Sequence, residues 1–215
     1  MSTLDDNAKR DIILEKSVDS DKALLEEERG LIEGAKRGDQ LSFKKLMDKY
    51  KSQVGGLAYR MVGSYEDARD ISQNVFIKAY QNLGSFDTKR KFSTWLYRIA
   101  MNASIDYLRK YRKHKTDHLD DLAGQLSDKK DGPEKVFNNT LVKLAVRDSL
   151  ESLNSKQKSV FVLRDLEGLD INEIAQITQM PQATVRWYLH RARAKLKGEL
   201  IKHHPLVLKR MGVRL

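Results

Sequence analysis

Cysteine is absent from this sequence, and helix-breaking residues are scarce, with 3 prolines and 12 glycines among 215 residues. Without cysteine the chain can form no disulfide, no thiolate zinc site and no cysteine nucleophile. No apolar run approaches the roughly 20 residues that span a bilayer, and the first residues lack the apolar core of a signal peptide. We therefore expect a cytoplasmic protein with no membrane insertion.

The usual sequence signals of enzyme chemistry are also missing. The five histidines form no HExxH pattern, and the chain has no glycine-rich phosphate loop and no GxSxG serine. His114 and His118 have the i, i+4 spacing of a metal pair, but no third ligand accompanies them. A nuclease would need clustered carboxylates beside its basic segments, and we find none. We therefore predict a protein that is not an enzyme, with no metal site and no cofactor.

Positive charge is the main feature that the sequence does contain. Lys and Arg total 40 against 30 Asp and Glu, a net charge of +10. Residues 1–30 hold nine acidic and five basic side chains, a net of −4, so the remaining residues carry +14. Because the charge belongs to the body of the chain, the expected partner is a polyanion or an acidic membrane surface.

Helical periodicity runs through most of the chain and predicts an all-α fold. Apolar spacing predicts helices over about 41–62, 65–83 and 92–112, and Ser64 begins a capping pattern. Between residues 116 and 135 the periodicity fails and six acids outnumber three lysines. The sequence therefore predicts two small helical domains joined by a flexible acidic linker. The expected segments are an acidic N-terminal extension (1–24), the first domain (25–115), the linker (116–135), the second domain (136–202) and a C-terminal tail (203–215).

Four helices are expected in the second domain, and the last two have the pattern of a helix-turn-helix. Ile174 and Ile177 supply one buried face, and Val185, Leu189 and Ala192 supply the facing one. The other face of the last helix is polar and cationic, which suits the major groove of DNA. A solvated basic helix in a bundle is the alternative. The candidate residues on this face are Thr184, Arg186, Trp187, His190, Arg191 and Arg193.

Aromatic and basic side chains alternate in a second cluster, around residues 86–113. Rings offer stacking surfaces to unpaired bases, while cations follow the phosphates, so the cluster suits single-stranded DNA. Trp95 fits either a core or a ligand-binding position. The candidate residues are Phe86, Lys89, Lys91, Trp95, Arg98 and Asn102.

Four sequence stretches, taken in order, carry a resemblance to a known family. They are LIEGAKRGDQLSFKKLMDKY, EDARDISQNVFIKAYQNLGSF, KFSTWLYRIAMNASIDYLRKYRK and LNSKQKSVFVLRDLEGLDINEIAQITQMPQATVRWYLHRARAKLK. With these stretches the chain resembles the small alternative sigma factors of bacterial RNA polymerase, the extracytoplasmic-function (ECF) group, over about residues 31–200.

The resemblance implies a role for each cluster. The first domain would correspond to sigma region 2 and the second to region 4. The basic face of the last helix would read the −35 element as a duplex, and the aromatic and basic cluster would bind the opened −10 strand. A third surface would dock on the β′ coiled coil of core polymerase. The residues at that surface are Asp67, Asp70, Gln73, Asn74 and Phe76.

The function implied is that of a transcription initiation factor. It would bind core RNA polymerase through the β′ coiled coil and the β flap, bind promoter DNA, and be held inactive by an anti-sigma factor. The alternative is a sigma-like decoy that binds an anti-sigma factor without binding DNA. The basic reading faces argue against the decoy, which would have little use for them.

Overall fold

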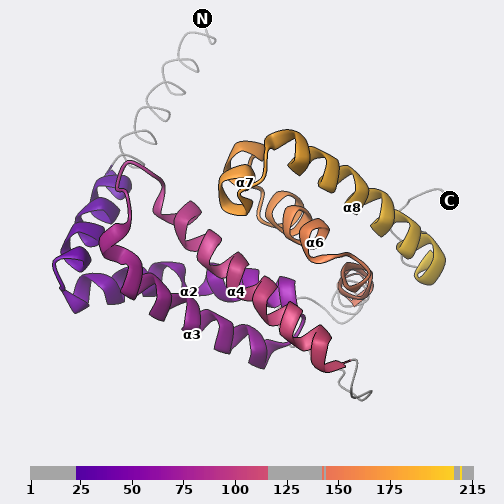
Figure 1. Cartoon of the computed structure of the whole chain (residues 1–215), viewed down its shortest axis with the longest axis horizontal. Coiled ribbons are helices and arrows are strands. Elements are labelled where there is room, and N and C mark those ends of the chain that lie inside the picture. The colour runs from indigo at the N-terminus through magenta and orange to yellow at the C-terminus, as the bar shows by residue number, and fades with distance from the viewer. Residues whose placement is uncertain (1–22, 116–141, 143, 206–208, 210–215) are drawn as a thin grey trace, which may run out of the picture.

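The computed structural model describes residues 23–115, 142, 144–205 and 209 (Figure 1). Within these residues every regular element is helical, which confirms the all-α fold class. The linker expected at 116–135 lies outside the described residues, as do most of the N-terminal extension and much of the C-terminal tail.

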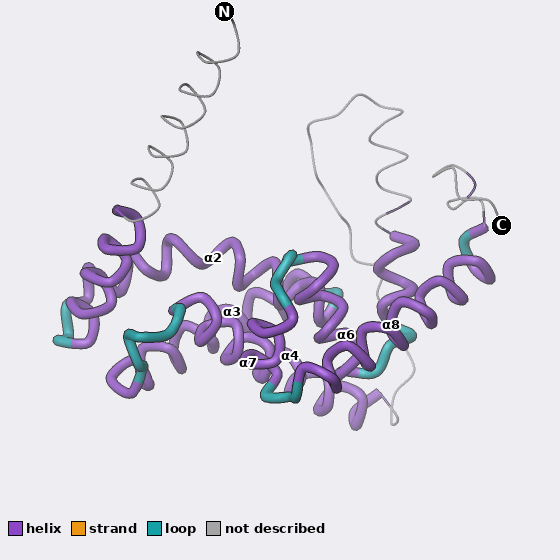
Figure 2. The backbone as a smooth tube through the Cα atoms, turned by 90° about the horizontal axis from the view of Figure 1, so that it is seen from above, coloured by secondary structure: helices purple, strands orange, loops and turns teal. Residues whose placement is uncertain are grey.

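Residues 23–115, here called the first helical unit, form a bundle. A helical segment at 23–36 leads into α2 (Gln40–Val62), α3 (Tyr65–Asn82), the short 3-10 turn η1 (Leu83–Ser85) and α4 (Phe92–Lys115). Each of α2, α3 and α4 contacts the other two, as Figures 1 and 2 show. The three helices bury one face each, at positions such as Leu57, Val75 and Leu96. This is the apolar spacing that the sequence predicted.

Polar caps set the starts of these helices. The Asp39 carboxylate accepts hydrogen bonds from the backbone N–H groups of Leu41 and Ser42, and the Ser64 hydroxyl accepts one from Asp67. Both caps satisfy N–H groups that have no partner within a helix. The predicted start at Ser64 is confirmed. Helix α4 runs three residues past its predicted end at residue 112, since no helix breaker occurs before Lys115.

Residues 144–205, the second helical unit, contain a helical segment at 144–151 followed by four elements. These are α6 (Ser155–Phe161), the π-helical turn η2 (Val162–Leu166), α7 (Ile171–Thr178) and α8 (Gln182–His203). Helix α6 continues directly into η2, where the backbone becomes π-helical. In that turn the Glu167 N–H donates to the Val162 carbonyl over 3.0 Å.

Reciprocal capping boxes begin α6 and α7. Asn154 caps α6 together with Gln157, and Asp170 caps α7 together with Glu173. In each box the cap side chain accepts from the third residue, whose own side chain accepts from the cap N–H. Pro181 occupies the N-cap of α8. The turn between α7 and α8 lies between Gln179, the left-handed C-cap of α7, and Pro181.

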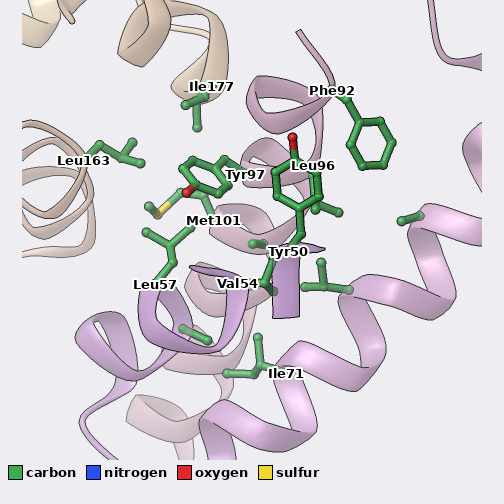
Figure 3. Close-up of a cluster of buried hydrophobic side chains, with 14 of the residues drawn as sticks. Tyr50, Val54, Leu57, Ile71, Phe92, Leu96, Tyr97, Met101, Leu163 and Ile177 are labelled. Atoms are coloured by element: carbon green, nitrogen blue, oxygen red, sulfur yellow. The ribbon is translucent and has the colours of Figure 1, made fainter. Parts of the chain in front are cut away.

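The two helical units pack against each other through α7 and α4, which lie side by side (Figures 1 and 2). Figure 3 shows Leu163 and Ile177 of the second unit next to Tyr97 and Met101 of α4. All four side chains are buried in a single apolar cluster. The sequence predicted two helical domains joined by a linker and did not address contact between them, so this shared core is a feature that only the structure reveals.

Candidate nucleic-acid interface

Helix α8 presents a basic surface because its apolar face is fully used for packing. Val185, Leu189 and Ala192 are buried against α6 and α7, as the helix-turn-helix pattern predicted. Five of the six candidate residues are exposed: Arg193, which is described below, and Arg186, Trp187, His190 and Arg191.

The exposed aromatic and cationic side chains on α8 support one another. The Arg191 guanidinium lies 5.0 Å from the centre of the Trp187 ring, and the Trp187 side chain is 52% exposed. Arg186 donates a hydrogen bond of 3.3 Å to Gln182. Neither arginine forms an ion pair within the described part of the chain. Both guanidinium groups are therefore available to a ligand, and Arg191 is oriented by a ring.

The remaining two candidates on α8 have different surroundings. Arg193 forms a two-point ion pair with Asp165, with donor-acceptor distances of 3.0 and 2.5 Å. The hydrogen bonds that Arg193 donates to the Asp165 carboxylate raise the pKa of Arg193 above its usual value. Thr184 is half-buried at the other edge of the exposed face. In this structure Arg193 holds α8 against η2, so a phosphate would have to compete with Asp165 for its guanidinium.

The loop between η1 and α4 brings together an aromatic cluster and exposed lysines. The ring centre of Phe86 lies 5.5 Å from that of Phe92 and 5.1 Å from that of Trp95. Lys36 donates a hydrogen bond of 2.7 Å to the Phe86 carbonyl, which ties the loop to the segment at 23–36. Lys89 and Lys91 are exposed on the outside of this loop.

Phe86 itself is not placed as the sequence suggested. Its side chain is only 3% exposed, so in this structure its ring is a core residue and offers no face to an unpaired base. The reason is that burying the ring against Phe92 and Trp95 removes its apolar surface from water. Trp95 is half-buried and fits both interpretations. On α4, Arg98 is half-buried and Asn102 is exposed, one and two turns beyond Trp95.

The candidate polymerase-binding residues lie along α3 but do not form one uniform surface. Asp70, Gln73 and Asn74 are exposed, whereas Asp67 is half-buried. Burial and a hydrogen bond to Asp67 raise the pKa of the Tyr107 hydroxyl. Asp67 therefore helps to hold α4 against α3, and its carboxylate is already engaged within the chain.

Gln73 and Phe76 line a groove that sequence reasoning missed. The groove has a volume of about 610 Å³ and runs between α2 and α3. The apolar residues of its wall include Phe43 and Met47 of α2. Ile77 and Tyr80 beside the groove are 55% and 43% exposed. The sequence could not reveal the groove, because the helical pattern does not show which of these apolar side chains stay exposed. The side chains that line the groove are Phe43, Met47, Lys51, Ser72, Gln73, Phe76, Ile77, Tyr80 and Gln81.

The described residues contain neither a metal-binding cluster nor a helix suited to cross a membrane. Among them, no group of three or more histidine, aspartate and glutamate side chains could hold a metal ion. None of the helices in these ranges has the length and apolar character needed to cross a bilayer. His118 lies outside the described residues, so the i, i+4 pair with His114 is not tested.

Comparison with known proteins places this architecture, an α2–α4 bundle followed by a helix-turn-helix, among transcription factors. The family model for Sigma-70 region 2 matches residues 46–114, and that for Sigma-70, region 4 matches residues 143–196. The ECF RNA polymerase sigma factor SigW of Bacillus subtilis (strain 168) is 37% identical over 176 residues, covering 79% of this chain and 94% of SigW. The ECF RNA polymerase sigma-E factor of Escherichia coli (strain K12) is 34% identical over 177 residues, covering 79% of this chain and 92% of that protein.

Solved structures agree at the level of the fold. CnrH, in complex with the cytosolic domain of CnrY, superposes with a TM-score of 0.62 at 24% identity, over 82% of this chain and 99% of CnrH. The chain belongs to the ECF group of RNA polymerase sigma factors. Members of this family are DNA-binding regulatory proteins that bind core RNA polymerase and promoter DNA and act in transcription initiation. The resemblance noted from the sequence is confirmed.

Proposed function

We propose that this chain directs core RNA polymerase to promoters by reading a −35 duplex with α8 and an opened −10 strand with the loop before α4. Family membership and one structural observation support this proposal. That observation is the exposed face of α8, where Arg186 and Arg191 are free of ion pairs within the described residues. Arginine is the side chain best suited to bidentate recognition of guanine in the major groove.

The side chains differ along α8, which supports base contacts near its start and phosphate contacts further along. Arg186, Trp187, His190 and Arg191 lie in the first half of the helix, where helix-turn-helix proteins contact base edges. Lys195 and Lys197 are exposed further along and suit phosphate contacts. Thr184 and Arg193 flank this face and are assigned to phosphate contacts, with Arg193 released from Asp165 on binding.

The proposed −10 site uses a different kind of recognition. Lys89 and Lys91 would follow the phosphates of the separated strand, while Trp95, Arg98 and Asn102 would meet a base turned out of the stack. Binding the unpaired state more tightly than the duplex is what favours strand opening. Phe86 supports this site from beneath, because its buried ring packs against Trp95.

Polymerase docking is assigned to the outer face of α3. Asp70, Gln73 and Asn74 offer acidic and amide groups to the β′ coiled coil, and the groove beside Phe76 offers apolar surface. The β flap is the proposed partner of the second helical unit. An anti-sigma protein is a further proposed partner, since CnrH was solved with the cytosolic domain of CnrY.

A decoy that binds only an anti-sigma factor is the second candidate. Such a protein would gain nothing from arginines that are exposed on α8 and form no ion pair within the described residues. We therefore favour a working initiation factor, acting in the cytoplasm beside the polymerase.

The proposal is tested by sequencing the transcripts that purified core polymerase starts on genomic DNA after this chain is added. We expect new start sites that share common upstream sequences. Arg186→Ala should then weaken binding to the recovered −35 duplex by about 1 to 3 kcal/mol and relax its sequence preference. Lys197→Ala is the matched control, because a lost phosphate contact weakens binding to every sequence alike. No new start sites, or an equal loss for both variants on all duplexes, would refute the assignment.

A further inference from the structure

The helical segment at 23–36 packs tightly on the bundle, although it lies before the residues that the region 2 family model matches. Ile32 and Ala35 are each 5% exposed and belong to the main apolar cluster. A Cβ at Gly34 would come within 2.6 Å of the Ser42 hydroxyl oxygen, so the segment approaches the start of α2 closely. Packing therefore fixes the position of this segment relative to α2.

Lys36, at the end of this segment, connects it to the loop between η1 and α4. Its ammonium group donates a hydrogen bond of 2.7 Å to the Phe86 carbonyl, 50 residues further along the chain, and the side chain is half-buried. Within the described first unit, the other hydrogen bonds of loop residues 86–91 join positions no more than four apart, such as that from the Arg90 N–H to the Asp87 carbonyl. A charged donor also makes a stronger hydrogen bond than a neutral one. Lys36 therefore fixes where the loop begins relative to the rest of the unit.

The residue that Lys36 holds is also part of an aromatic cluster, formed by Phe86, Phe92 and Trp95. The Trp95 ring centre lies 5.1 Å from that of Phe86 and 5.5 Å from that of Phe92. The two phenylalanine side chains are each 3% exposed, whereas Trp95 is half-buried. A shift of Phe86 would therefore change how much of the Trp95 ring is open to solvent and to a ligand.

The segment at 23–36 reaches the same aromatic cluster by a second route, through α2. Glu28 accepts a hydrogen bond of 2.8 Å from the Tyr50 hydroxyl, and the Tyr50 ring centre lies 5.4 Å from that of Phe92. Burial, and then the hydrogen bond to Glu28, raise the pKa of Tyr50, so its hydroxyl remains a donor at neutral pH. The segment is therefore tied to the cluster at two points, of which Lys36 is the one that holds the loop itself.

We propose that Lys36 is a positioning residue of the −10 site, which holds the loop so that Trp95 presents its ring to an unpaired base. The proposal rests on the proposed function, which assigns Trp95 to that site. Without the hydrogen bond from Lys36, the Phe86 carbonyl would turn to water and the start of the loop would be free to move. Single-stranded DNA would then have to order the loop as it binds, and this cost would lower the affinity. Unlike Lys89 and Lys91, Lys36 acts without touching the strand.

The first test measures the surroundings of Trp95 without DNA. The chain has two tryptophans, so Trp187→Phe leaves Trp95 as the single tryptophan fluorophore. In this background Lys36→Met, which keeps most of the apolar side chain, should raise the acrylamide quenching constant about twofold, because a loosened loop uncovers the indole. Lys36→Arg keeps a charged donor and should restore the original constant. An unchanged constant in Lys36→Met would overturn the proposal.

The second test measures the affinity of the full chain for a fluorescein-labelled single-stranded DNA of random sequence, about 20 nucleotides long, at about 50 to 200 mM salt. Lys36→Met should bind this probe about three- to tenfold more weakly than the wild type, as expected for the loss of one hydrogen bond. The slope of log affinity against log salt concentration should not change, whereas loss of a direct phosphate contact would reduce it by about 0.7. Lys36→Arg should bind as the wild type does.

Lys44→Met is the matched control for charge. It removes one positive charge from an exposed position of α2 and should bind the probe within about twofold of the wild type, because exposed charges are screened by salt. Circular dichroism and urea unfolding check that each variant is folded at the temperature of both tests. If Lys36→Met fails to fold, Lys36→Gln replaces it with the same expectations, since it removes the same charge and its side chain is one bond shorter.

The outcomes separate the positioning role from the proposed function. A loss of affinity with a slope reduced by about 0.7 would mean that Lys36 itself contacts a phosphate, which contradicts a positioning role. Increased quenching without loss of affinity would mean that order in the loop does not serve strand binding, and would overturn the proposal as well. Failure of the wild-type chain to bind the strand, alone or with core polymerase, would refute the proposed −10 site, while the quenching of Trp95 would still decide whether Lys36 orders the loop.

Discussion

Ile177→Ala is the substitution that best probes how α7 is held. The side chain is 1% exposed and belongs to the cluster that joins α7 to α8 and to α4. Replacement by alanine removes three buried carbon atoms, which at about 0.8 kcal/mol each represents about 2.4 kcal/mol of transfer free energy. The cavity left behind adds to this loss, so we expect a total of about 2 to 5 kcal/mol.

The loss is measured by urea unfolding followed by circular dichroism and tryptophan fluorescence. For an m-value of about 2 kcal/mol per molar urea, the midpoint should fall by about 1 to 2.5 M. Ile201→Ala is the matched control, since this residue of α8 is 42% exposed and its loss should change the free energy of unfolding by less than about 0.5 kcal/mol. The α7 helix has only eight residues and little stability of its own, so it depends on this packing.

A loss below about 1 kcal/mol for Ile177→Ala would refute the reasoning. It would mean that the space around Ile177 is not filled by its neighbours, so that α7 is not packed simultaneously on α4 and α8. A loss equal to that of Ile201→Ala would have the same meaning.

Two further predictions concern single acidic residues. Asp70→Lys reverses an exposed charge on α3 and should weaken co-purification with core polymerase about tenfold or more. Asp148→Lys, at an exposed position in the second unit, is the control and should not weaken it. Equal yields of holoenzyme for the two variants would mean that the docking face lies elsewhere. Hydrogen bonds from Ser42 and from the Leu41 N–H lower the pKa of Asp39 below 3.8, so the stabilisation by its charge is present above that pH and is lost as the pH falls through the lowered value. The melting temperature of the wild type should therefore exceed that of Asp39→Asn at pH 7 and equal it near pH 2. A difference in melting temperature that persists in acid would contradict this.

Helix α3 contributes both to the core of the bundle and to the lining of the groove between α2 and α3. Val75 and Ala79 are fully buried in the bundle, while Ile77 and Tyr80 on the neighbouring turns remain exposed. An isolated exposed apolar side chain is common on a soluble protein and needs no explanation. Here the exposed residues instead border a lined groove next to Gln73, which gives the proposed docking face an apolar component.

Helix positions and their caps followed from the sequence alone, because they depend on residues within a few positions of each other. The capping boxes of Asn154 with Gln157 and of Asp170 with Glu173 each join residues three apart. The helix-turn-helix was equally accessible, since Ile177 and Val185 lie on facing helices joined by a short turn. The order of the four stretches that carry the resemblance was enough to suggest the family. The residues free to face DNA on α8 followed from the same helical period.

Tertiary structure alone decided which long-range partners meet. Arg60 and Glu167 are 107 residues apart, and among 40 basic and 30 acidic side chains no local pattern selects this pair. Phe86 illustrates the same limit, because an aromatic ring in a basic loop suits both a base and a core, and only the position of Phe92 and Trp95 buries it. Local hydrogen bonding is encoded by neighbours in the chain, whereas burial and charge pairing depend on the approach of distant segments. The contact that closes the two units on each other belongs to the second kind.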